Sequence, residues 1–263
     1  MFNNFKIFLL IILFSAQTSV LAQLPYKTDW TIETLTIGIG AAAGISSLLI
    51  NDNLKPLTQE QINLLNTNHI NGFDRFATNY YLPDLAKVSD VLVTTTVASP
   101  FLLLFSPKIR DGWATTGTMY VEAMLLAMAL PHLTKGLVKR TRPYAYNPET
   151  PMNIKTETDT RRSFFSGHTT IAFTSAVFLS KVYSDIYPGS KYIPYVWGGS
   201  LLVATSVGLL RIFSGKHFPS DVLTGAAFGS LIGWAIPELH KKISGGNVNM
   251  NVGAMGINFS YMF

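Results

Sequence analysis

The 263-residue chain contains no cysteine and few charged residues, and both absences narrow what it can be. Without cysteine there is neither a disulfide framework nor a thiolate metal site. Charged residues make up only 13% of the chain, about half of the roughly 25% typical of soluble globular proteins. Hydrophobic residues make up 48%, which is too many for a disordered chain. The composition is therefore that of a folded and unusually apolar protein.

The few charges present are mostly positive. The formal net charge of +5 favours anionic partners, whether phosphate compounds, lipid surfaces or nucleic acid. Between residues 131 and 170, seven Lys and Arg residues stand against three acidic ones. The aromatic–basic pattern typical of nucleic-acid binding does not accompany them. We therefore expect an anionic substrate and no nucleic-acid partner, while the oligomeric state is left open.

Residues 1–22 resemble a secretory signal peptide. Lys6 precedes a short apolar run over residues 7–14, and Ala22 ends a small-x-small pattern that suits cleavage. The alternative is an uncleaved anchor helix. Export without cysteine suggests a protein of the bacterial cell envelope that does without disulfides.

Six long apolar segments follow, and each approaches the ~20 residues that cross a bilayer as a helix. They are Thr34–Asn51, Val91–Pro107, Gly112–Thr134, Ser163–Ser180, Tyr192–Leu210 and Val222–Pro237. They predict an all-α six-helix bundle that is embedded in a membrane, with a soluble bundle of buried helices as the alternative. We expect an N-terminal apolar helix and amphipathic helices over 23–87, a catalytic helical core over 88–242 and a tail over 243–263.

The tail changes pattern from helical to alternating. Val248, Met250 and Val252 alternate with asparagines, and a second alternating run ends at Phe263. This pattern predicts a short β-hairpin. It would be an accessory hairpin on the helices or an element for association with the outer membrane, because two strands cannot form a barrel.

The first stretch that carries chemistry runs from Lys135 to Pro143. Residues seven apart lie on one face of a helix, so a helix continuing through Arg142 would point Lys135 and Arg142 the same way, until Pro143 ends it. Two such cations can bind a doubly charged phosphate. The alternative is a positive cluster at the end of a membrane helix, since Lys139 and Arg140 are also there.

The second stretch is Ser166-Gly167-His168, directly before an apolar helix pattern. Ser166 can cap that helix, Gly167 allows a ligand close to the backbone, and free N–H groups there attract an anion. His168 can donate a proton to a leaving group near neutral pH. On its own, a histidine at a helix start is more often structural.

The third stretch runs from Arg211 to Asp221. His217 and Asp221 are four residues apart, so the carboxylate can accept the ring N–H and leave the other ring nitrogen free as a nucleophile. A turn at Ser214-Gly215 would bring Arg211 back toward His217. In isolation, a surface His–Asp pair is the simpler interpretation.

Together, Lys-x6-Arg-Pro, Ser-Gly-His and Arg-x5-His-x3-Asp resemble the signature of the type 2 phosphatidic acid phosphatase and vanadium haloperoxidase superfamily. The resemblance extends from about Val91 to Glu238, and each motif lies at the end of an apolar segment. Two positions depart from the usual pattern: Phe165 stands where proline is common, and Leu210 where serine is common. Neither position supplies a group that the chemistry needs. An aromatic pocket rim formed by Phe164, Phe165 and Phe218 is one interpretation, and simple packing of helix ends is the other.

The resemblance implies a role for each matching residue. Lys135, Arg142 and Arg211 would bind the phosphoryl oxygens, helped by Ser166 and the Gly167 N–H. His217 would be the nucleophile that forms a phosphohistidine, Asp221 would orient it, and His168 would be the general acid. No cofactor or metal is expected, because the three cations supply the charge neutralisation that Mg²⁺ gives elsewhere.

The predicted function is that of a metal-independent phosphatase acting on a lipid phosphate or pyrophosphate in the bacterial envelope. Candidate substrates are phosphatidic acid, phosphatidylglycerol phosphate, undecaprenyl pyrophosphate and a lipid A phosphate. The alternatives are a vanadate-dependent haloperoxidase and a non-catalytic envelope protein that binds phosphate lipids. Of the remaining histidines, His69, His132 and His240 show no ligand spacing, and we interpret them as structural or exposed. Arg161 and Arg162 either add positive potential to the site or are solvated.

We expect the active site to face the periplasm, but the number of membrane crossings before it conflicts with this expectation. If the signal is cleaved and all six segments cross, the third segment ends in the cytoplasm together with Lys135 and Arg142. One early segment would then have to remain uncrossed, and Thr34–Asn51 is the candidate for lying within or on the bundle. Otherwise the signal is an anchor and another segment does not span.

Overall fold

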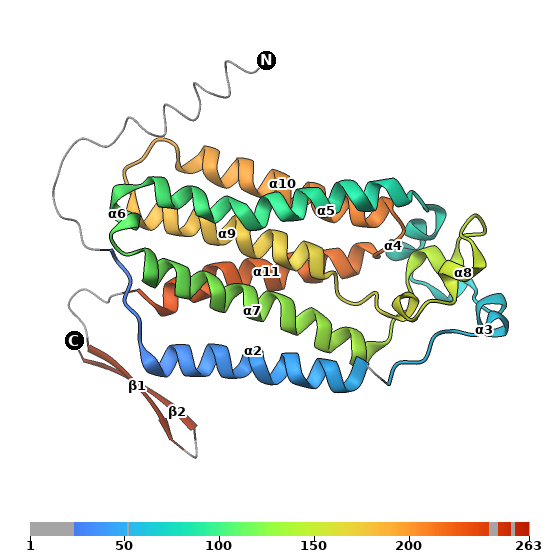
Figure 1. Cartoon of the computed structure of the whole chain (residues 1–263), viewed down its shortest axis with the longest axis horizontal. Coiled ribbons are helices and arrows are strands. Elements are labelled where there is room, and N and C mark those ends of the chain that lie inside the picture. Colours follow the sequence, from blue (N-terminus) through green and yellow to red (C-terminus); the bar gives the residue numbers. More distant parts are fainter. Residues whose placement is uncertain (1–23, 52, 242–246, 254–255, 263) are drawn as a thin grey trace.

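The computed structural model describes residues 24–51, 53–241, 247–253 and 256–262, so the expected signal peptide lies outside the described residues. Within them, six long helices run side by side in alternating directions (Figure 1). Their bounds are α2 (Trp30–Asn51), α5 (Pro83–Ala98), α7 (Trp113–Val138), α9 (Gly167–Ile186), α10 (Ile193–Phe213) and α11 (Pro219–Leu239). The predicted all-helical bundle is confirmed for this part of the chain.

The short helices connect the long ones. They are α3 (Gln59–Asn63), η1 (Thr67–His69), α4 (Gly72–Arg75), η2 (Phe76–Asn79), η3 (Ser99–Phe105), α6 (Pro107–Arg110), η4 (Pro143–Tyr146), α8 (Met152–Lys155) and η5 (Thr158–Arg161). Elements α3, α4 and α8 gather at one end of the bundle and α6 lies at the other (Figure 1). The long helices α7 and α10 end, and α9 and α11 begin, at the end that carries α3, α4 and α8. We call this end the motif end.

Helix α9 occupies the centre of the bundle and packs against α5, α7, α10 and α11. Its buried residues are mainly small or hydroxyl-bearing, and serine and threonine hydroxyls bond within the bundle. The Thr174 hydroxyl donates to the Gly229 carbonyl of α11 at 3.1 Å, and Ser180 and Ser200 hydroxyls lie 2.8 Å apart between α9 and α10. Small polar side chains therefore allow this helix to be surrounded by its neighbours.

Helices α9 and α11 approach closely because glycines of α11 line the contact. A Cβ atom at Gly225, Gly229 or Gly233 would lie 2.4–2.7 Å from a backbone carbonyl oxygen of Ser166, Thr170 or Thr174. The glycines are four residues apart and so share one face of α11. This small-residue face is the kind that brings membrane helices into contact. It fixes the start of α9 against the start of α11, where two of the three motifs lie.

Five of the long helices are long and apolar enough to cross a membrane: α2, α5 with its continuation η3, α7, α10 and α11. Each exposes large apolar side chains on its outer face. Examples are Leu49, Val91, Val121, Leu202 and Leu231. The chain is an integral membrane protein with several transmembrane helices. Of the six apolar segments, Ser163–Ser180 forms the enclosed, hydroxyl-rich α9 and is not among these five.

Helix α2 extends along α7 for its whole length (Figure 1). At its C-terminal end the Asn51 side-chain amide donates to the His132 carbonyl at 3.1 Å, and a Cβ at Gly136 would meet Ile50 at 2.7 Å. The Thr34–Asn51 segment is thus an outer helix that reaches the motif end and qualifies as a span. The expectation that this segment remains uncrossed stays a prediction.

At the C-terminal end, strands β1 (Asn247–Gly253) and β2 (Gly256–Met262) pair antiparallel, with Val248 opposite Tyr261 and Val252 opposite Ile257. A single bridge between Tyr26 and Lys241 joins the chain before α2 to the chain after α11.

Candidate active site

The helix predicted to continue through Arg142 ends four residues earlier. Helix α7 stops at Val138, and Lys139 takes a left-handed conformation with φ of 51° while its N–H bonds back to the Lys135 carbonyl. This residue turns the chain out of the helix, so Arg142 lies in extended backbone before η4. The common helical face proposed for Lys135 and Arg142 is therefore wrong. The two cations meet through the loop instead.

The buried Arg142 guanidinium is held in place by three hydrogen bonds. Its Nε and NH2 groups donate to the carbonyl and carboxylate oxygens of Asp159, each at 2.8 Å, and its NH1 donates to the Lys216 carbonyl at 2.8 Å. NH1 also lies 3.4 Å from Nε2 of His217. Burial alone raises the pKa of Asp159, but the positive charges of Arg142 and Lys216 lower it to about 2. Asp159 therefore remains ionised and fixes the guanidinium beside His217.

The second motif begins α9 as predicted. The Ser166 hydroxyl caps the helix by accepting from the Thr169 N–H at 3.4 Å, and the Ser166 N–H donates to the Asp221 carbonyl at 3.1 Å. A Cβ at Gly167 would lie only 3.5 Å from Nζ of Lys135. The lysine amino group therefore lies directly against the first turn of α9.

Asp90 of α5 joins the second motif to the third. Its Oδ1 lies 2.9 Å from Nε2 of His168 and accepts from NH1 of Arg211 at 3.1 Å. No motif in the sequence marks Asp90 as a site residue, although it is the last charged residue before an uncharged apolar run. Only the packing of α5 against α9 and α10 brings this carboxylate to both side chains.

His217 lies in the loop between α10 and α11 and is almost completely buried. Burial lowers its pKa well below the ordinary value of 6.5, and the positive charges of Arg142, Lys135 and Arg211 lower it further. The neutral ring is therefore the stable form. The contact predicted between its N–H and Asp221 is not a hydrogen bond, because Nδ1 and Oδ2 are 3.6 Å apart and Nδ1 has no other partner.

Asp221 already has other partners, which explains that distance. Its Oδ2 accepts from the Ser163 hydroxyl at 2.6 Å and from the Phe218 N–H at 2.9 Å, while Oδ1 pairs with Arg140. These contacts hold the carboxylate at the start of α11, facing Nδ1 of His217.

Arg140 is one of the positive charges after α7, and its side chain has specific partners in the structure. It bridges Asp221 and Asp74 of α4, donates to the Ser220 hydroxyl at 2.8 Å, and its guanidinium carbon lies 4.1 Å from the centre of the Phe218 ring. Both carboxylates are buried. Arg140 thus anchors the start of α11.

The aromatic rim does not form as described. Phe165 is buried and stacks on Phe228 at 5.2 Å, and Phe218 is buried beneath Arg140. Phe164 is half-buried against Phe165. Packing of helix ends is therefore the role that fits Phe165 and Phe218. Arg161 donates to the Lys55 carbonyl at 3.1 Å, away from His217.

The eight residues singled out in the sequence therefore come together in one cluster at the motif end. They are Lys135, Arg142, Ser166, Gly167, His168, Arg211, His217 and Asp221. The cluster combines three buried or half-buried cations, a helix N-terminus and a neutral imidazole, which is the equipment for binding a phosphoryl group. Of the remaining histidines, His69 and His132 are exposed, whereas His240 is fully buried and faces Glu122.

The fold is that of a helical membrane protein, and the cluster at its motif end contains side chains of the kind that bind phosphate groups. Residues 116–244, which contain all three motifs, match the PAP2 superfamily. The chain belongs to this superfamily.

Two curated relatives illustrate the similarity. The chain is 35% identical over 131 residues to the bacitracin transport permease protein BcrC of Bacillus licheniformis, covering 47% of this chain and 59% of that protein. It is 26% identical over 151 residues to the lipid A 4′-phosphatase of Porphyromonas gingivalis, covering 56% and 60%. The matches thus span about three fifths of the length of these relatives.

Among solved structures, a transmembrane PAP2 type phosphatidylglycerolphosphate phosphatase from Bacillus subtilis aligns with a TM-score of 0.41 at 19% identity, covering 89% of this chain and 92% of that chain. Aquifex aeolicus LpxE aligns with a TM-score of 0.36 at 22% identity, covering 62% and 92%.

Proposed function

We propose that this protein is a metal-independent phosphatase that hydrolyses a lipid phosphate or pyrophosphate through a phosphohistidine on His217. The observation that carries the proposal is the environment of Nε2 of His217. This atom lies 3.4 Å from the Arg142 guanidinium, on a buried ring whose pKa is lowered by burial and by the surrounding positive charges. A neutral imidazole among cations is a nucleophile placed where a phosphoryl group would bind.

Lys135, Arg142 and Arg211 bind the non-bridging oxygens of the phosphoryl group, with the Ser166 hydroxyl and the Gly167 N–H as further donors. The N-terminus of α9 adds its free N–H groups and the positive end of its dipole. Arg142 is suited to this role because Asp159 and the Lys216 carbonyl already hold it in place. Little reorganisation is therefore needed when charge builds up on the oxygens.

In the first step, Nε2 of His217 attacks phosphorus while the bond from phosphorus to the leaving oxygen breaks. His168 donates a proton to that oxygen, so the leaving group departs as an alcohol or a phosphate. In the second step, water gives a proton to His168 and its oxygen attacks phosphorus, which breaks the phosphorus–nitrogen bond and releases inorganic phosphate. Asp221 faces Nδ1 of His217 and stabilises the positive charge on the phosphorylated ring.

The lipid nature of the substrate is supported by the position of the cluster. It lies at the end of helices with exposed apolar surfaces, which is where lipid headgroups meet a membrane protein. The names of relatives point the same way, since they include a lipid A 4′-phosphatase and a decaprenylphosphoryl-5-phosphoribose phosphatase. Phosphatidic acid, phosphatidylglycerol phosphate, undecaprenyl pyrophosphate and a lipid A phosphate are the substrates we propose to compare.

The deciding experiment is phosphate release from this lipid panel by detergent-solubilised protein in EDTA. We expect release from at least one lipid, inhibition by vanadate, and loss of release in His217→Ala. His69→Ala, an exposed histidine in the loop before α4, is the matched control and should match the wild type. Undiminished release by His217→Ala would refute the nucleophile. Bromide oxidation with peroxide, without release from any lipid, would instead indicate a haloperoxidase, and phosphate binding without either activity a binding protein.

We further propose that the protein belongs to the cell envelope and that the cluster faces the periplasm. Helix α2 starts at the far end of the bundle and ends at the motif end. If the signal peptide is cleaved after Ala22, a periplasmic active site therefore requires that one long helix does not cross the membrane. The cysteine-free sequence offers a direct test. An impermeant maleimide applied to intact cells should label Asn68→Cys at the motif end and not Asp111→Cys at the other. The reverse pattern would place the cluster in the cytoplasm.

A further inference from the structure

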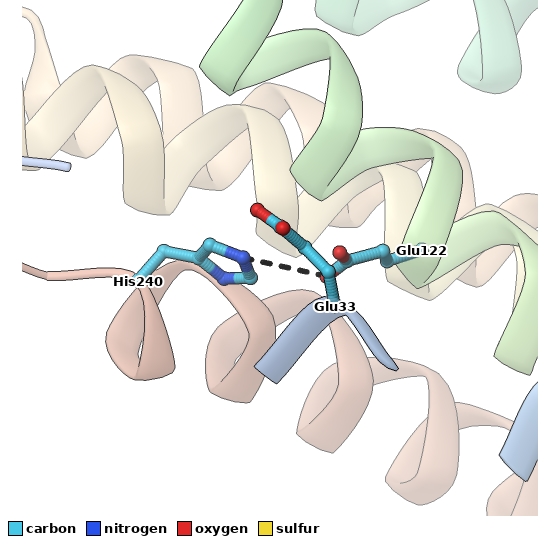
Figure 2. A group of neighbouring side chains, drawn as sticks. All are labelled: Glu33, Glu122 and His240. Carbon is cyan, nitrogen blue, oxygen red and sulfur yellow. Dashed lines mark ion pairs between the residues drawn. The ribbon is translucent and has the colours of Figure 1, made fainter. Parts of the chain in front are cut away.

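Three ionisable side chains from different helices meet at the end of the bundle away from the motifs (Figure 2). Glu33 comes from the first turn of α2, Glu122 from α7 and His240 from the residue that ends α11. One ligand atom of each lies within 4.8 Å of the others. Glu122 and Lys135 are thirteen residues apart on α7, or about 20 Å at the helical rise, so this group is separate from the candidate active site.

The members of this group on α7 and α11 are completely buried, and the atoms that they turn toward one another lack hydrogen-bond partners. Glu122 and His240 are both 0% exposed. Neither carboxylate oxygen of Glu122 has a partner, and neither does Nε2 of His240. A buried carboxylate without compensation is costly, and such groups in proteins are normally paired or bound to a metal ion. A positive charge bound between them would supply the missing compensation.

The hydrogen bond on the other side of the His240 ring fixes which nitrogen is free. Nδ1 lies 2.9 Å from the Ile236 carbonyl oxygen, which can only accept, so Nδ1 carries the hydrogen. In the neutral ring Nε2 then presents a lone pair, and it points at Oε2 of Glu122 from 3.5 Å. Metal-binding histidines are oriented in this way, with the second ring N–H donated to a backbone carbonyl.

The 3.5 Å separation between Nε2 of His240 and Oε2 of Glu122 matches the spacing of two ligand atoms on one metal ion. A charged N–H···O contact is about 2.7–2.9 Å long, so a proton between these atoms would draw them closer. Two ligand atoms on a tetrahedral ion with bonds of about 2.1 Å lie about 3.4 Å apart. Glu33 is also positioned, since its Oε1 accepts from the Asp29 N–H at 3.1 Å. Two carboxylates, a neutral imidazole and one divalent ion have zero net charge.

We propose that Glu33, Glu122 and His240 form a binding site for a divalent transition-metal ion of the zinc type, with water completing its coordination. The donor set of one imidazole nitrogen and two carboxylate oxygens suits Zn²⁺, whereas Ca²⁺ and Mg²⁺ prefer oxygen ligands alone. The site joins the start of α2, the middle of α7 and the end of α11. The Lys27 N–H also donates to the His240 carbonyl at 2.9 Å, so the metal connects segments that are already adjacent.

The role of this ion is structural. Helix α2 packs mainly against α7, and the chain has no cysteine with which to fasten it by a disulfide. An ion bound by three helices stabilises their packing because the unfolded chain lacks the preformed site. The ion takes no part in the phosphatase chemistry proposed above, which remains metal-independent. Glu122 lies about 20 Å along α7 from Lys135 at the motif end.

The test uses detergent-solubilised, full-length protein that has been stripped with EDTA and then titrated with ZnCl₂. We expect one bound zinc per chain by elemental analysis. With zinc at about a hundredfold excess over its Kd, we expect the apparent unfolding temperature to rise by about 5 °C or more. Glu122→Gln and His240→Asn should each abolish the rise and weaken zinc binding by at least about 100-fold. His240→Asn keeps an amide donor for the Ile236 carbonyl but removes the ligand nitrogen.

The matched control is Glu238→Gln, which removes a carboxylate at the same end of α11 that pairs with Lys181 and Lys241. It should retain one zinc per chain and the full thermal shift. In EDTA, Glu122→Gln should be at least as stable as the wild type, because the variant removes a buried uncompensated charge. The proposal is overturned if zinc does not bind the wild type at one per chain, or if Glu122→Gln lowers the unfolding temperature equally with EDTA and with zinc. If that variant does not fold, the partly exposed Glu33→Gln decides by the same two measurements.

Discussion

The two ends of the bundle bury opposite charges. At the motif end, Arg142, Arg211 and the Lys135 amino group surround the neutral ring of His217. At the other end, the Glu122 carboxylate lies buried without a hydrogen bond beside His240 and Glu33. Each end thus contains an excess of one sign that the protein leaves incompletely paired. The first arrangement suits an anion that comes and goes, and the second suits a cation that remains.

The two ends also differ in how firmly the surrounding protein holds them. Arg142 is fixed by Asp159 and the Lys216 carbonyl, and Arg140 is fixed by Asp74 and Asp221. The Glu122 carboxylate has no such support within the described residues. A catalytic site needs its charges placed before the substrate arrives, whereas a structural metal can itself supply the missing order.

The largest effect is expected when the anion-binding charge itself is removed. Arg142→Gln should lower kcat/KM on the lipid substrate about 1000-fold, equivalent to about 4 kcal/mol, because this guanidinium lies beside Nε2 of His217 and meets the charge that develops on the phosphoryl oxygens. The measurement is the steady-state rate of phosphate release. Arg161→Gln is the control, since Arg161 contacts only the Lys55 carbonyl among the described residues. A fall of less than tenfold in Arg142→Gln would contradict the assignment.

At the motif end, a variant of Arg140 tests the effect of a residue that positions the site and does not itself bind phosphate. Arg140→Gln leaves Asp74 and Asp221 buried without their cation, so we expect a loss of about 3 kcal/mol in the free energy of unfolding. At temperatures where the variant is folded, kcat should fall while KM changes little, because Asp221 is displaced but the phosphate-binding cations remain. Denaturant unfolding and steady-state kinetics measure the two effects. Adding Asp74→Asn should restore part of the stability, and failure to do so would argue against the network.

The motif end could be predicted well because its chemistry is contiguous in the sequence. Ser166 caps α9 as predicted, and the four-residue spacing places Asp221 opposite His217, although 3.6 Å apart and not hydrogen-bonded. The length of the helix before Arg142 could not be predicted, since it depends on the left-handed turn at Lys139. Six apolar segments predicted the bundle, but their similar composition hid the fact that α9 is its enclosed centre.

The partners of His168, Arg211 and His240 could not be predicted from the sequence, because they come from distant helices. Asp90 reaches His168 and Arg211 from α5, and Glu122 reaches His240 from α7. No spacing rule connects such residues, because only the packing of the bundle brings them together. The signals in the sequence are a carboxylate within an otherwise uncharged apolar segment, Glu122, and one directly before such a segment, Asp90. In both cases that carboxylate is placed beside a histidine.

Asp90 should have a smaller effect than Arg142, because it acts through His168 and Arg211. We expect Asp90→Asn to lower kcat about 10- to 100-fold and to move the alkaline limb of the pH profile to lower pH. Burial and the positive charge of Arg211 lower the pKa of His168 to about 4, and the Asp90 carboxylate opposes them by favouring the protonated ring. The measurement is kcat against pH. Asp84→Asn, an exposed acid on the same helix that pairs with Lys87, is the matched control. A fall in kcat without any change in the pH profile would indicate a purely structural role.

The smallest expected effect is a change in the pKa of one residue, His217. It tests the difference in charge between the two ends of the bundle directly. In phosphate-free protein we expect His217 to titrate below the ordinary value of 6.5, because burial and three positive charges favour the neutral ring. Bound inorganic phosphate brings negative charge beside the ring and should raise the pKa of His217, whereas zinc at the other end should leave it unchanged. Histidine-labelled NMR is suited to this measurement, since the chain has only five histidines and His217→Gln identifies the resonance. A His217 that titrates at its ordinary value without phosphate, or that responds to zinc instead, would contradict the division of charge between the two ends.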